Sequence, residues 1–324
     1  MNSLELFKTQ KFYQIDISIL KDLGYDVLLS NRIFDSLLFW KYDILFSYFY
    51  RYSFFAALLA KCFGKKTYFT GGIDSLDSDY ASAFNYKIQA LFFKLCYWVA
   101  DSCIIVSQSD LKNIFKVSSL KKKLSYSEHV INTKLFIADV PKEKIFTSIV
   151  WMGDEGNVVR KGVDKALQIF AELKKIPEFV DYRFVIIGRK GEGEVLVRSI
   201  IDKYNLKGSV ELKGEVSEED KINLLKQSKY YFQLSLYEGF GLAALEALCA
   251  NNIIIHSGKG GLANPIYKEQ LLFDIDNDFD SELLKLVNKL ACFTPITSYD
   301  NLLEYYDIQR RKDDFEAIIV NGKS

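Results

Sequence analysis

An apolar strand, a glycine-rich turn and a helix follow one another at residues 230–250, and this junction constrains the chain more than any other segment. Residues 230–236 (YYFQLSL) are apolar enough for a buried strand, and residues 242–250 are rich in good helix formers. The first N–H groups of a helix lack partners within it, and the helix dipole places partial positive charge there. Gly239 and Gly241 let an anion approach this backbone closely. The junction therefore predicts a site for an anion such as a diphosphate.

Two carboxylates bracket the turn. Glu238 precedes Gly239-Phe240-Gly241, and Glu246 lies within the helix that follows. One carboxylate can then face each side of a bound diphosphate, where sugar hydroxyls need acceptors. This arrangement predicts a nucleotide-sugar site. The alternative is an ordinary strand-loop-helix with two solvated glutamates.

Short β-rich runs alternate with helical stretches along the whole chain, which is the pattern of parallel α/β sheets. In the first half we expect strands at residues 26–29, 43–48, 66–70 and 103–107. Helices are expected there at residues 10–23, 53–62, 81–100 and 109–115. In the second half we expect strands at residues 148–152, 183–188, 210–213, 230–236, 252–257 and 271–274. Helices are expected there at residues 163–175, 192–204 and 217–227.

The length of 324 residues indicates two domains, because single cores seldom grow beyond about 250 residues. A short link at residues 140–147, which contains Pro141, separates the two halves. We therefore expect domains at residues 1–147 and 148–324, with the last helix able to pack back on the first domain. Ligands bind outside the carboxyl ends of strands in such sheets, so two facing sheets would share a cleft.

The net charge is zero, which argues against a nucleic-acid partner bound through a broad basic surface. No uncharged apolar run reaches the roughly 18 residues of a membrane span, and the first twelve residues, MNSLELFKTQKF, lack the apolar core of a signal peptide. We therefore expect a cytoplasmic protein. The five cysteines are widely spaced in apolar surroundings, so we expect reduced core residues without disulfides or metal.

The balanced total conceals an asymmetry between the two halves. Residues 1–147 carry 19 Lys and Arg against 14 Asp and Glu, whereas residues 148–324 carry 23 against 28. The first half also holds aromatic clusters at residues 48–55 and 92–98 and a basic run at 121–123. These could form a surface that rests on anionic lipid, as a peripheral membrane contact. The alternative is an aromatic core with one solvated lysine loop.

The segment SLYEGFGLAALEALCANNIIIHSGKGG, residues 235–261, resembles the E-x7-E signature of the retaining glycosyltransferases of family 4. The order of Glu238, the Gly-Phe-Gly turn, Glu246, a strand and a Gly-Gly loop carries the resemblance. It implies the GT-B fold, an α/β architecture of two Rossmann-like doubly wound domains facing across a cleft. It also implies that a hexose moves, with retention, from a nucleotide diphosphate sugar to a saccharide or lipid-linked acceptor in cell-surface polysaccharide biosynthesis.

The resemblance assigns roles to further residues. Glu246 is expected to hold the ribose, and Glu238 the donor sugar as a catalytic residue. The diphosphate would be bound by Arg160, Lys161 and the turn amides of Gly239, Phe240, Gly241 and Leu242. Gly188 and Leu212 would lie near the nucleotide, and Asp74, a second catalytic candidate, would face the sugar from the first domain. For Arg160 and Lys161 the alternative is a solvated loop, and for Asp74 a helix cap after a Gly-Gly turn.

Neither a metal nor a resident cofactor is expected. The Asp274-Ile275-Asp276 motif could hold Mn²⁺ on a diphosphate, but it comes late and among other acidic residues, which favours a solvated loop. The resemblance implies that retention proceeds by front-face attack, in which the leaving phosphate oxygen takes the acceptor's proton. The two histidines, His129 and His256, are interpreted as structural.

One departure from the family pattern concerns the beginning of the sequence. Family members start with a strand and a glycine-rich loop, whereas this sequence begins near the following helix, which ends in LKDLGYDV at residues 20–27. Either the first sheet is incomplete or residues 4–7 form a degenerate strand. The departure favours a rival function, a non-catalytic subunit that binds a nucleotide or a partner. An epimerase or phosphorylase of the same fold is a further rival.

Overall fold

The computed structural model describes residues 3–322 except 72, 79, 120, 138–139 and 294–299. Its contacts divide the chain into a first unit, residues 1–132 with 304–324, and a second unit, residues 133–303. The division therefore lies before the expected boundary at 147/148. Strand β5 (Glu143–Ile149) explains the difference, because it pairs with strands of the second sheet.

The second unit is built on a six-stranded parallel sheet in the order β10-β9-β8-β5-β6-β7. Strand order reverses between β5 and β8, which is the doubly wound arrangement. All six expected strands are present, with ends displaced by a few residues. The other five are β6 (Arg183–Ile187), β7 (Val210–Gly214), β8 (Ser228–Gln233), β9 (Ile253–His256) and β10 (Leu271–Leu272).

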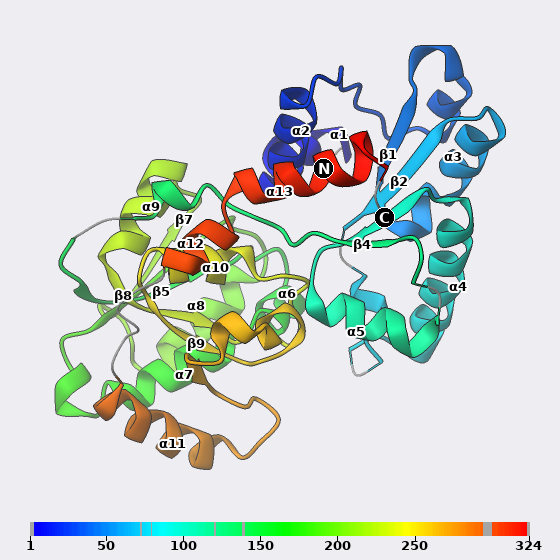
Figure 1. Ribbon diagram of the computed structural model, residues 1–324. Helices are drawn as coiled ribbons and strands as arrows, with labels where there is room; N and C mark the ends of the chain where they lie inside the picture. Colours follow the sequence, from blue (N-terminus) through cyan, green and yellow to red (C-terminus); the bar gives the residue numbers. More distant parts are fainter. Residues whose placement is uncertain are drawn as a thin grey trace. The chain divides into compact units, whose positions relative to one another are not determined.

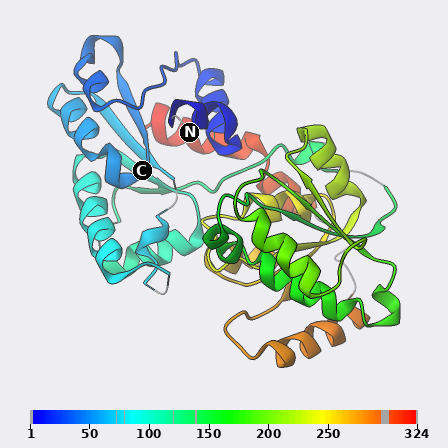
Figure 2. The same ribbon diagram turned by 180° about the vertical axis from the view of Figure 1, so that it is seen from behind.

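Helices cover both faces of this sheet. On one face, α7 (Val163–Leu173), α8 (Glu194–Lys203) and α11 (Phe279–Cys292) enclose the core around Phe146 and Phe184, and Figure 2 shows the green α7 and α8 lying over it. On the other face lie α9 (Glu218–Gln227) and α10 (Leu242–Cys249). Burial on both faces explains why β6 and β9 are apolar runs without alternation, whereas the edge strand β7 (VELKG) alternates.

The first unit holds a four-stranded parallel sheet whose strands follow chain order. They are β1 (Ile44–Tyr48), β2 (Lys66–Thr70), β3 (Ser102–Ile105) and β4 (Leu124–Tyr126). On one face pack α3 (Tyr50–Cys62), α4 (Ala83–Val99) and α5 (Gln108–Val117), which cover Phe69 and Ile105. Tyr68 and Ile104 point to the opposite face, as the two-residue period of a strand requires.

That opposite face is covered by helices from both ends of the chain. Figure 1 shows α2 (Lys11–Asp22, blue) beside α13 (Ile308–Phe315, red), and the two helices are in contact. Arg311 of α13 is fully buried and forms a bidentate ion pair with Asp16 of α2, with N–O distances of 2.7 and 2.9 Å. Its remaining nitrogen donates to the carbonyl oxygens of Ser127 and Glu128. This pair fixes the last helix to the first unit.

Three expectations for the first half need correction. Residues 26–29 form no strand, because no described strand lies beside them and Leu28 is 72% exposed. Residues 4–7 belong to helix α1 (Ser3–Thr9) and are not a strand stub. Cys62 is exposed, whereas Cys96, Cys103 and Cys249 are buried and free; the side chain of Cys292 lies outside the described ones.

The remaining elements are short. Two further α-helices are α6 (Glu155–Arg160) and α12 (Asp300–Tyr305), and a π-helical turn (Glu316–Val320) follows α13. The 3₁₀ turns are Ile33–Leu37, Phe39–Lys41, Asp74–Leu76, Thr133–Leu135, Pro177–Phe179, Gly260–Ala263 and Pro265–Tyr267. Among the described residues no helix has the length and apolar character needed to cross a bilayer.

Arg311→Ala should lower the free energy of unfolding by about 3 to 5 kcal/mol, because it leaves the Asp16 carboxylate buried without its cation. Urea denaturation measures the change. Lys312→Ala, at the neighbouring position of the same helix, is the control and should cost under about 0.5 kcal/mol. Equal losses for the two variants would show that the buried pair does not fix α13.

Candidate functional site

The strands β5 and β8 are neighbours at the point where the second sheet reverses its order. The loops that follow them lead to opposite faces of the sheet, which opens space at the carboxyl ends of these two strands. The loops also touch. The N–H of Leu236 donates to the carbonyl of Arg160 at 2.8 Å, and a Cβ on Gly162 would meet the Leu234 carbonyl oxygen at 2.0 Å. With a φ of 67°, Gly162 is the residue that allows this approach.

The Glu238 carboxylate is the centre of this junction. Its Oε1 accepts hydrogen bonds from Lys161 Nζ at 2.5 Å, Gln233 Nε2 at 2.7 Å and Ser235 Oγ at 2.8 Å. The side chains of Lys161 and Glu238 are 22% and 11% exposed. The sequence predicted both residues but placed them in separate roles. The structure brings them together as an ion pair.

The Gly-Phe-Gly turn is held between two loops. Gly241 precedes α10 with a φ of 89° and provides no side-chain cap for the helix. On the other side the N–H of Gly261 donates to the Glu238 carbonyl at 2.6 Å, and a Cβ on Gly260 would meet the same oxygen at 2.2 Å. The amino end of α10 therefore lies beside the Lys161–Glu238 pair; the sequence predicted the strand-to-helix junction but not the pair.

Glu246 lies in α10 and is almost fully buried, with 4% of its surface exposed. Its Oε2 accepts from Lys221 Nζ of α9 at 2.7 Å, and Lys221 also pairs with Glu218. The interpretation of Glu238 and Glu246 as two solvated glutamates is therefore wrong. Lys221 was not expected at the site, because nothing in the sequence shows that α9 packs beside α10.

The other predicted donor residues lie in or after β6 and β7 and at the end of α6. Arg160 ends α6 and donates from its guanidinium to Asn157 Oδ1 at 2.6 Å. Gly188 follows β6 with a φ of 130°, and a Cβ there would meet the Val150 carbonyl oxygen at 2.0 Å, so the glycine packs two strand ends together. Leu212 lies in β7 and packs against the core instead of lining a described pocket with Glu238.

The sequence did not predict two polar residues that contact Glu238. Gln233 and Ser235 both direct hydrogen bonds to Glu238, and Gln233 also donates to Ser235 Oγ at 2.9 Å. Both are buried within the otherwise apolar run YYFQLSL. Because buried polar groups need partners, a polar residue in such a run is itself a signal of a nearby site.

Asp74 lies in the first unit and is exposed, at the start of the turn Asp74–Leu76. Beside this turn lies Asp110, which is fully buried in the first turn of α5. Asp110 Oδ1 accepts from the N–H of Ile73 at 3.3 Å, and its Oδ2 has no hydrogen-bond partner among the described residues. Burial, with the nearby Asp74 charge as a second cause, raises the pKa of Asp110 to about 8.

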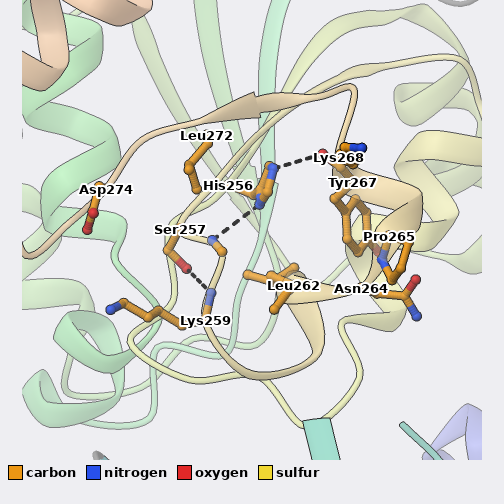
Figure 3. Close-up of a pocket in the computed structure, with 12 residues that line it drawn as sticks. His256, Ser257, Lys259, Leu262, Asn264, Pro265, Tyr267, Lys268, Leu272 and Asp274 are labelled. Carbon is orange, nitrogen blue, oxygen red and sulfur yellow. Dashed lines mark hydrogen bonds between the residues drawn. The ribbon is translucent and has the colours of Figure 1, made fainter. Parts of the chain in front are cut away.

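A pocket of about 460 Å³ lies at the carboxyl ends of β9 and β10 (Figure 3). In it, His256 Nδ1 accepts from the N–H of Gly258 at 3.2 Å, which leaves Nε2 to donate to the Tyr267 carbonyl at 3.1 Å. Burial lowers the pKa of His256 to about 4, so the ring is neutral and structural, as expected. None of the predicted donor residues lines this pocket.

The Asp274-Ile275-Asp276 motif is engaged in local contacts. Asp276 forms an ion pair with Lys259, and the Asp274 carboxylate accepts from the N–H of Asp276 and from Asn277 Nδ2, each at 3.1 Å. Within the described ranges no three His, Cys, Asp or Glu side chains gather in a set that could hold a metal ion. Metal independence itself stays a prediction.

Comparison with known proteins relates this geometry to a family. Residues 156–290 match the family model for Glycosyl transferases group 1, and this range contains the Lys161–Glu238 pair and Glu246. The second unit therefore carries a segment similar to the group 1 glycosyltransferases.

Two curated proteins illustrate the similarity. GDP-mannose:cellobiosyl-diphosphopolyprenol alpha-mannosyltransferase of Xanthomonas oryzae pv. oryzae (strain PXO99A) is 32% identical over 163 residues, 44% of this chain and 40% of the relative. The phosphatidylinositol N-acetylglucosaminyltransferase GPI3 subunit of Saccharomyces cerevisiae is 27% identical over 129 residues, 40% of this chain and 28% of the relative. The chain thus spans less than half the length of either relative.

Solved structures share the fold at low identity. Anabaena Alr3699/HepE in complex with UDP-glucose has a TM-score of 0.72 and 11% identity, covering 94% of this chain and 88% of that chain. Sucrose-phosphate synthase from Thermosynechococcus elongatus has a TM-score of 0.61 and 18% identity, covering 98% and 77%. The expected fold class is confirmed: the chain has the GT-B fold, with parallel α/β sheets in two domains. The expectation that both sheets are doubly wound needs correction, because the described strands of the first sheet follow chain order without a reversal.

The raised pKa of Asp110 predicts a pH-dependent stability. The unfolded chain releases this proton near pH 4, whereas the folded protein keeps it to about pH 8. The folded state therefore binds more protons between these values, so the contribution of Asp110 is complete below about pH 4 and is lost as the pH rises toward 8. Asp110→Asn stays neutral, and its melting temperature relative to wild type should rise across this range.

Differential scanning calorimetry at several pH values measures this difference. Asp280→Asn, at an exposed position of the second unit, is the control and should show a constant offset from wild type. A constant offset for Asp110→Asn as well would mean that the buried carboxyl is ionised in the folded protein.

Proposed function

We propose that the protein is a retaining glycosyltransferase that moves a hexose from a nucleotide diphosphate sugar to a saccharide or lipid-linked saccharide acceptor. The observation that carries the proposal is the Lys161–Glu238 pair beside the amino end of α10, where the second sheet reverses its strand order. Anions bind at such helix ends, and nucleotides bind at such reversals. The match of residues 156–290 to the group 1 family supports the same function.

Glu238 is oriented for contact with a sugar. All three of its described hydrogen bonds end on Oε1, so Oε2 accepts none from the described residues. A carboxylate held through one oxygen presents the other in a fixed direction. In the proposed complex this oxygen accepts hydrogen bonds from donor-sugar hydroxyls, which places the sugar for transfer.

Lys161 and Arg160 supply positive charge for the diphosphate. As the glycosidic bond breaks, negative charge accumulates on the leaving diphosphate, so a cation placed there stabilises the transition state more than the ground state. The amides at the start of α10, after Gly241, add a fixed positive dipole without a side-chain cap in front of it. Lys161 is already desolvated by its position, with 22% of its side chain exposed.

Glu246 is proposed to bind the ribose hydroxyls. Its ion pair with Lys221, at 2.7 Å, gives the buried carboxylate a partner and fixes its position. Lys221 is thereby a positioning residue for Glu246. The pair couples α10, which would carry the nucleotide, to the neighbouring α9.

The names of two relatives indicate what kind of acceptor this chain could use. The Xanthomonas protein is named for a cellobiosyl-diphosphopolyprenol acceptor and the Saccharomyces protein for phosphatidylinositol. The first acceptor is a saccharide attached to a lipid and the second is itself a lipid, which supports a lipid-linked acceptor for this chain. We place its reaction at the inner face of the membrane, in cell-surface polysaccharide biosynthesis.

The reaction is proposed to need no metal and no resident cofactor. The leaving phosphate oxygen would take the proton of the acceptor hydroxyl as the new bond forms on the same face, so no separate general base is required. Lys161 and Arg160 would then do the work of charge neutralisation that a divalent cation does in metal-dependent transferases.

A second candidate is a non-catalytic subunit that binds a nucleotide or a partner. Transfer or hydrolysis of a donor by the purified protein would exclude this candidate.

Glu246→Ala should weaken nucleotide binding about 10- to 100-fold, because it removes charge-assisted hydrogen bonds to the ribose. Glu238→Gln should largely keep nucleotide affinity, because Lys161, Glu246 and the amides of α10 remain, and should lower turnover about 100-fold, because the sugar loses its position. Calorimetry with UDP, GDP and ADP, followed by donor turnover with the corresponding nucleotide sugars, measures both effects.

Glu282→Ala is the matched control for Glu246→Ala. Glu282 is also nearly buried, at 5% exposed, and pairs with a lysine, Lys285, at 2.6 Å, but it lies in α11. It should leave nucleotide binding unchanged. Equal nucleotide affinity for wild type and Glu246→Ala would refute the ribose role, and binding without turnover by wild type would favour the non-catalytic subunit.

Turnover should persist in EDTA, because lysine, arginine and helix amides provide the positive charge at the diphosphate. The rate of donor consumption with and without EDTA measures this. A strict requirement for Mn²⁺ would contradict the proposal and would return attention to Asp274 and Asp276, which Asp276→Asn would then test.

A further inference from the structure

Helix α4 of the first unit exposes large apolar side chains along one stripe. Phe84, Leu91 and Trp98 are 71%, 55% and 71% exposed. They are spaced by seven residues, so they lie on the same side of the helix. The opposite side of α4 packs into the core through Phe93 and Tyr97. The exposed stripe is therefore additional to the apolar face that holds the helix in the fold.

Helix α3 repeats this arrangement. Tyr52 and Phe55 are 76% and 54% exposed, and Phe63, directly after the helix, is 40% exposed. Helices α3 and α4 lie side by side on one face of the first sheet, as Figure 1 shows in blue and cyan. Two adjacent helices thus present apolar and aromatic side chains away from the core. Single exposed apolar residues are ordinary, whereas a contiguous patch marks an interaction surface.

The segment before α3 extends the patch. Phe34 and Trp40 are 78% and 66% exposed. Phe39 stacks on Phe63 with ring centroids 4.2 Å apart, which joins this segment to the end of α3. The turn Ile33–Leu37 also contacts α3.

The charges on the two helices have one sign. Helix α3 carries Arg51 and Lys61, α4 carries Lys87 and Lys94, and neither helix contains Asp or Glu. Lys61 is paired with Asp101 at 2.8 Å. Lys87 and Lys94 follow Phe84 and Leu91 by three residues each, so they lie within the apolar stripe.

We propose that this surface docks on an anionic lipid bilayer. We call it the lipid-facing surface and define it by the outward side chains of Tyr52, Phe55, Phe84, Leu91 and Trp98 with Lys87 and Lys94. Aromatic and aliphatic side chains insert at the level of the headgroups, and lysines among them attract anionic phosphates. Trp and Tyr are the side chains that favour this interface.

The charge pattern disfavours a second copy of the chain as the occupant. A twofold dimer would place the same patch on both sides, so the cations Arg51, Lys87 and Lys94 would meet a surface whose helices carry only positive charge. Helices α3 and α4 offer no carboxylate to pair with them. A bilayer rich in anionic phosphates complements the same charges. The inference does not depend on the transfer reaction, because docking is a property of the first unit.

Vesicle sedimentation of the full chain tests the proposal. The wild type should bind vesicles of phosphatidylcholine with phosphatidylglycerol, bind neutral phosphatidylcholine vesicles at least about tenfold more weakly, and lose affinity as salt rises. The double variant Lys87→Glu, Lys94→Glu should lose at least about 25-fold in partitioning, since each basic residue contributes roughly fivefold. The triple variant Phe84→Ser, Leu91→Ser, Trp98→Ser should lose binding to both kinds of vesicle.

Val195→Ser, Leu284→Ser is the matched control. Both residues lie in the second unit and are 70% and 63% exposed, so the variant removes a similar kind of side chain from another surface. It should bind like wild type. Circular dichroism confirms that the variants fold, and the lysine variants leave all apolar packing intact.

A fluorescence measurement in a folded protein provides an independent readout. With Trp40→Phe and Trp151→Phe, Trp98 is the remaining tryptophan of the chain, and brominated lipid should quench it on vesicle addition. Absence of vesicle binding by wild type, equal binding by the lysine variant, or an unquenched Trp98 would overturn the proposal. Self-association of wild type that the triple variant abolishes, without vesicle binding, would assign the surface to a protein partner instead.

Discussion

The close approach of two loops at the carboxyl ends of β5 and β8 is the constraint on which the site depends. A Cβ at position 162 would lie only 2.0 Å from the Leu234 carbonyl oxygen, so only glycine fits there. This close contact between the loops brings Lys161 beside Glu238. Any larger residue would push the loop away and separate the ion pair. The chemistry of the site therefore depends on a backbone contact as much as on the charged groups. Gly260 sets the position of Glu238 from the other side in the same way.

The first unit is organised by a different interaction. Its sheet has helices α3, α4 and α5 on one face, which come from the connections between its strands. The other face is completed by α2 and α13, from the two ends of the chain. Tyr48, whose hydroxyl donates to Asp16 at 2.9 Å, links the buried Asp16–Arg311 pair to strand β1. A buried ion pair contributes little net stability, yet it specifies which helix completes the face.

The sequence predicted the second unit better than the first, for physical reasons. Buried parallel strands such as β6 and β9 are apolar runs between helices, and all six strands of the second unit were recognised. Leu28 and Leu29 gave a similar signal at residues 26–29, but they are exposed and belong to no strand. Glu238 and Lys161 were identifiable from their motifs. Lys221 was not, because its distance from Glu246 depends on how α9 packs beside α10, which spacing along the chain does not encode.

The aromatic clusters of the first half admitted two interpretations, a core or a lipid surface, and α4 combines both. Phe93 and Tyr97 enter the core, whereas Leu91 and Trp98 lie on the opposite side. In the basic run 121–123, Lys123 has a structural role. Lys123 donates to the carbonyl of Trp98 at 3.0 Å, where it caps the carboxyl end of α4 and complements the helix dipole. Lys123, which the sequence suggested as a lipid contact, thus stabilises α4, whose own lysines Lys87 and Lys94 face outward.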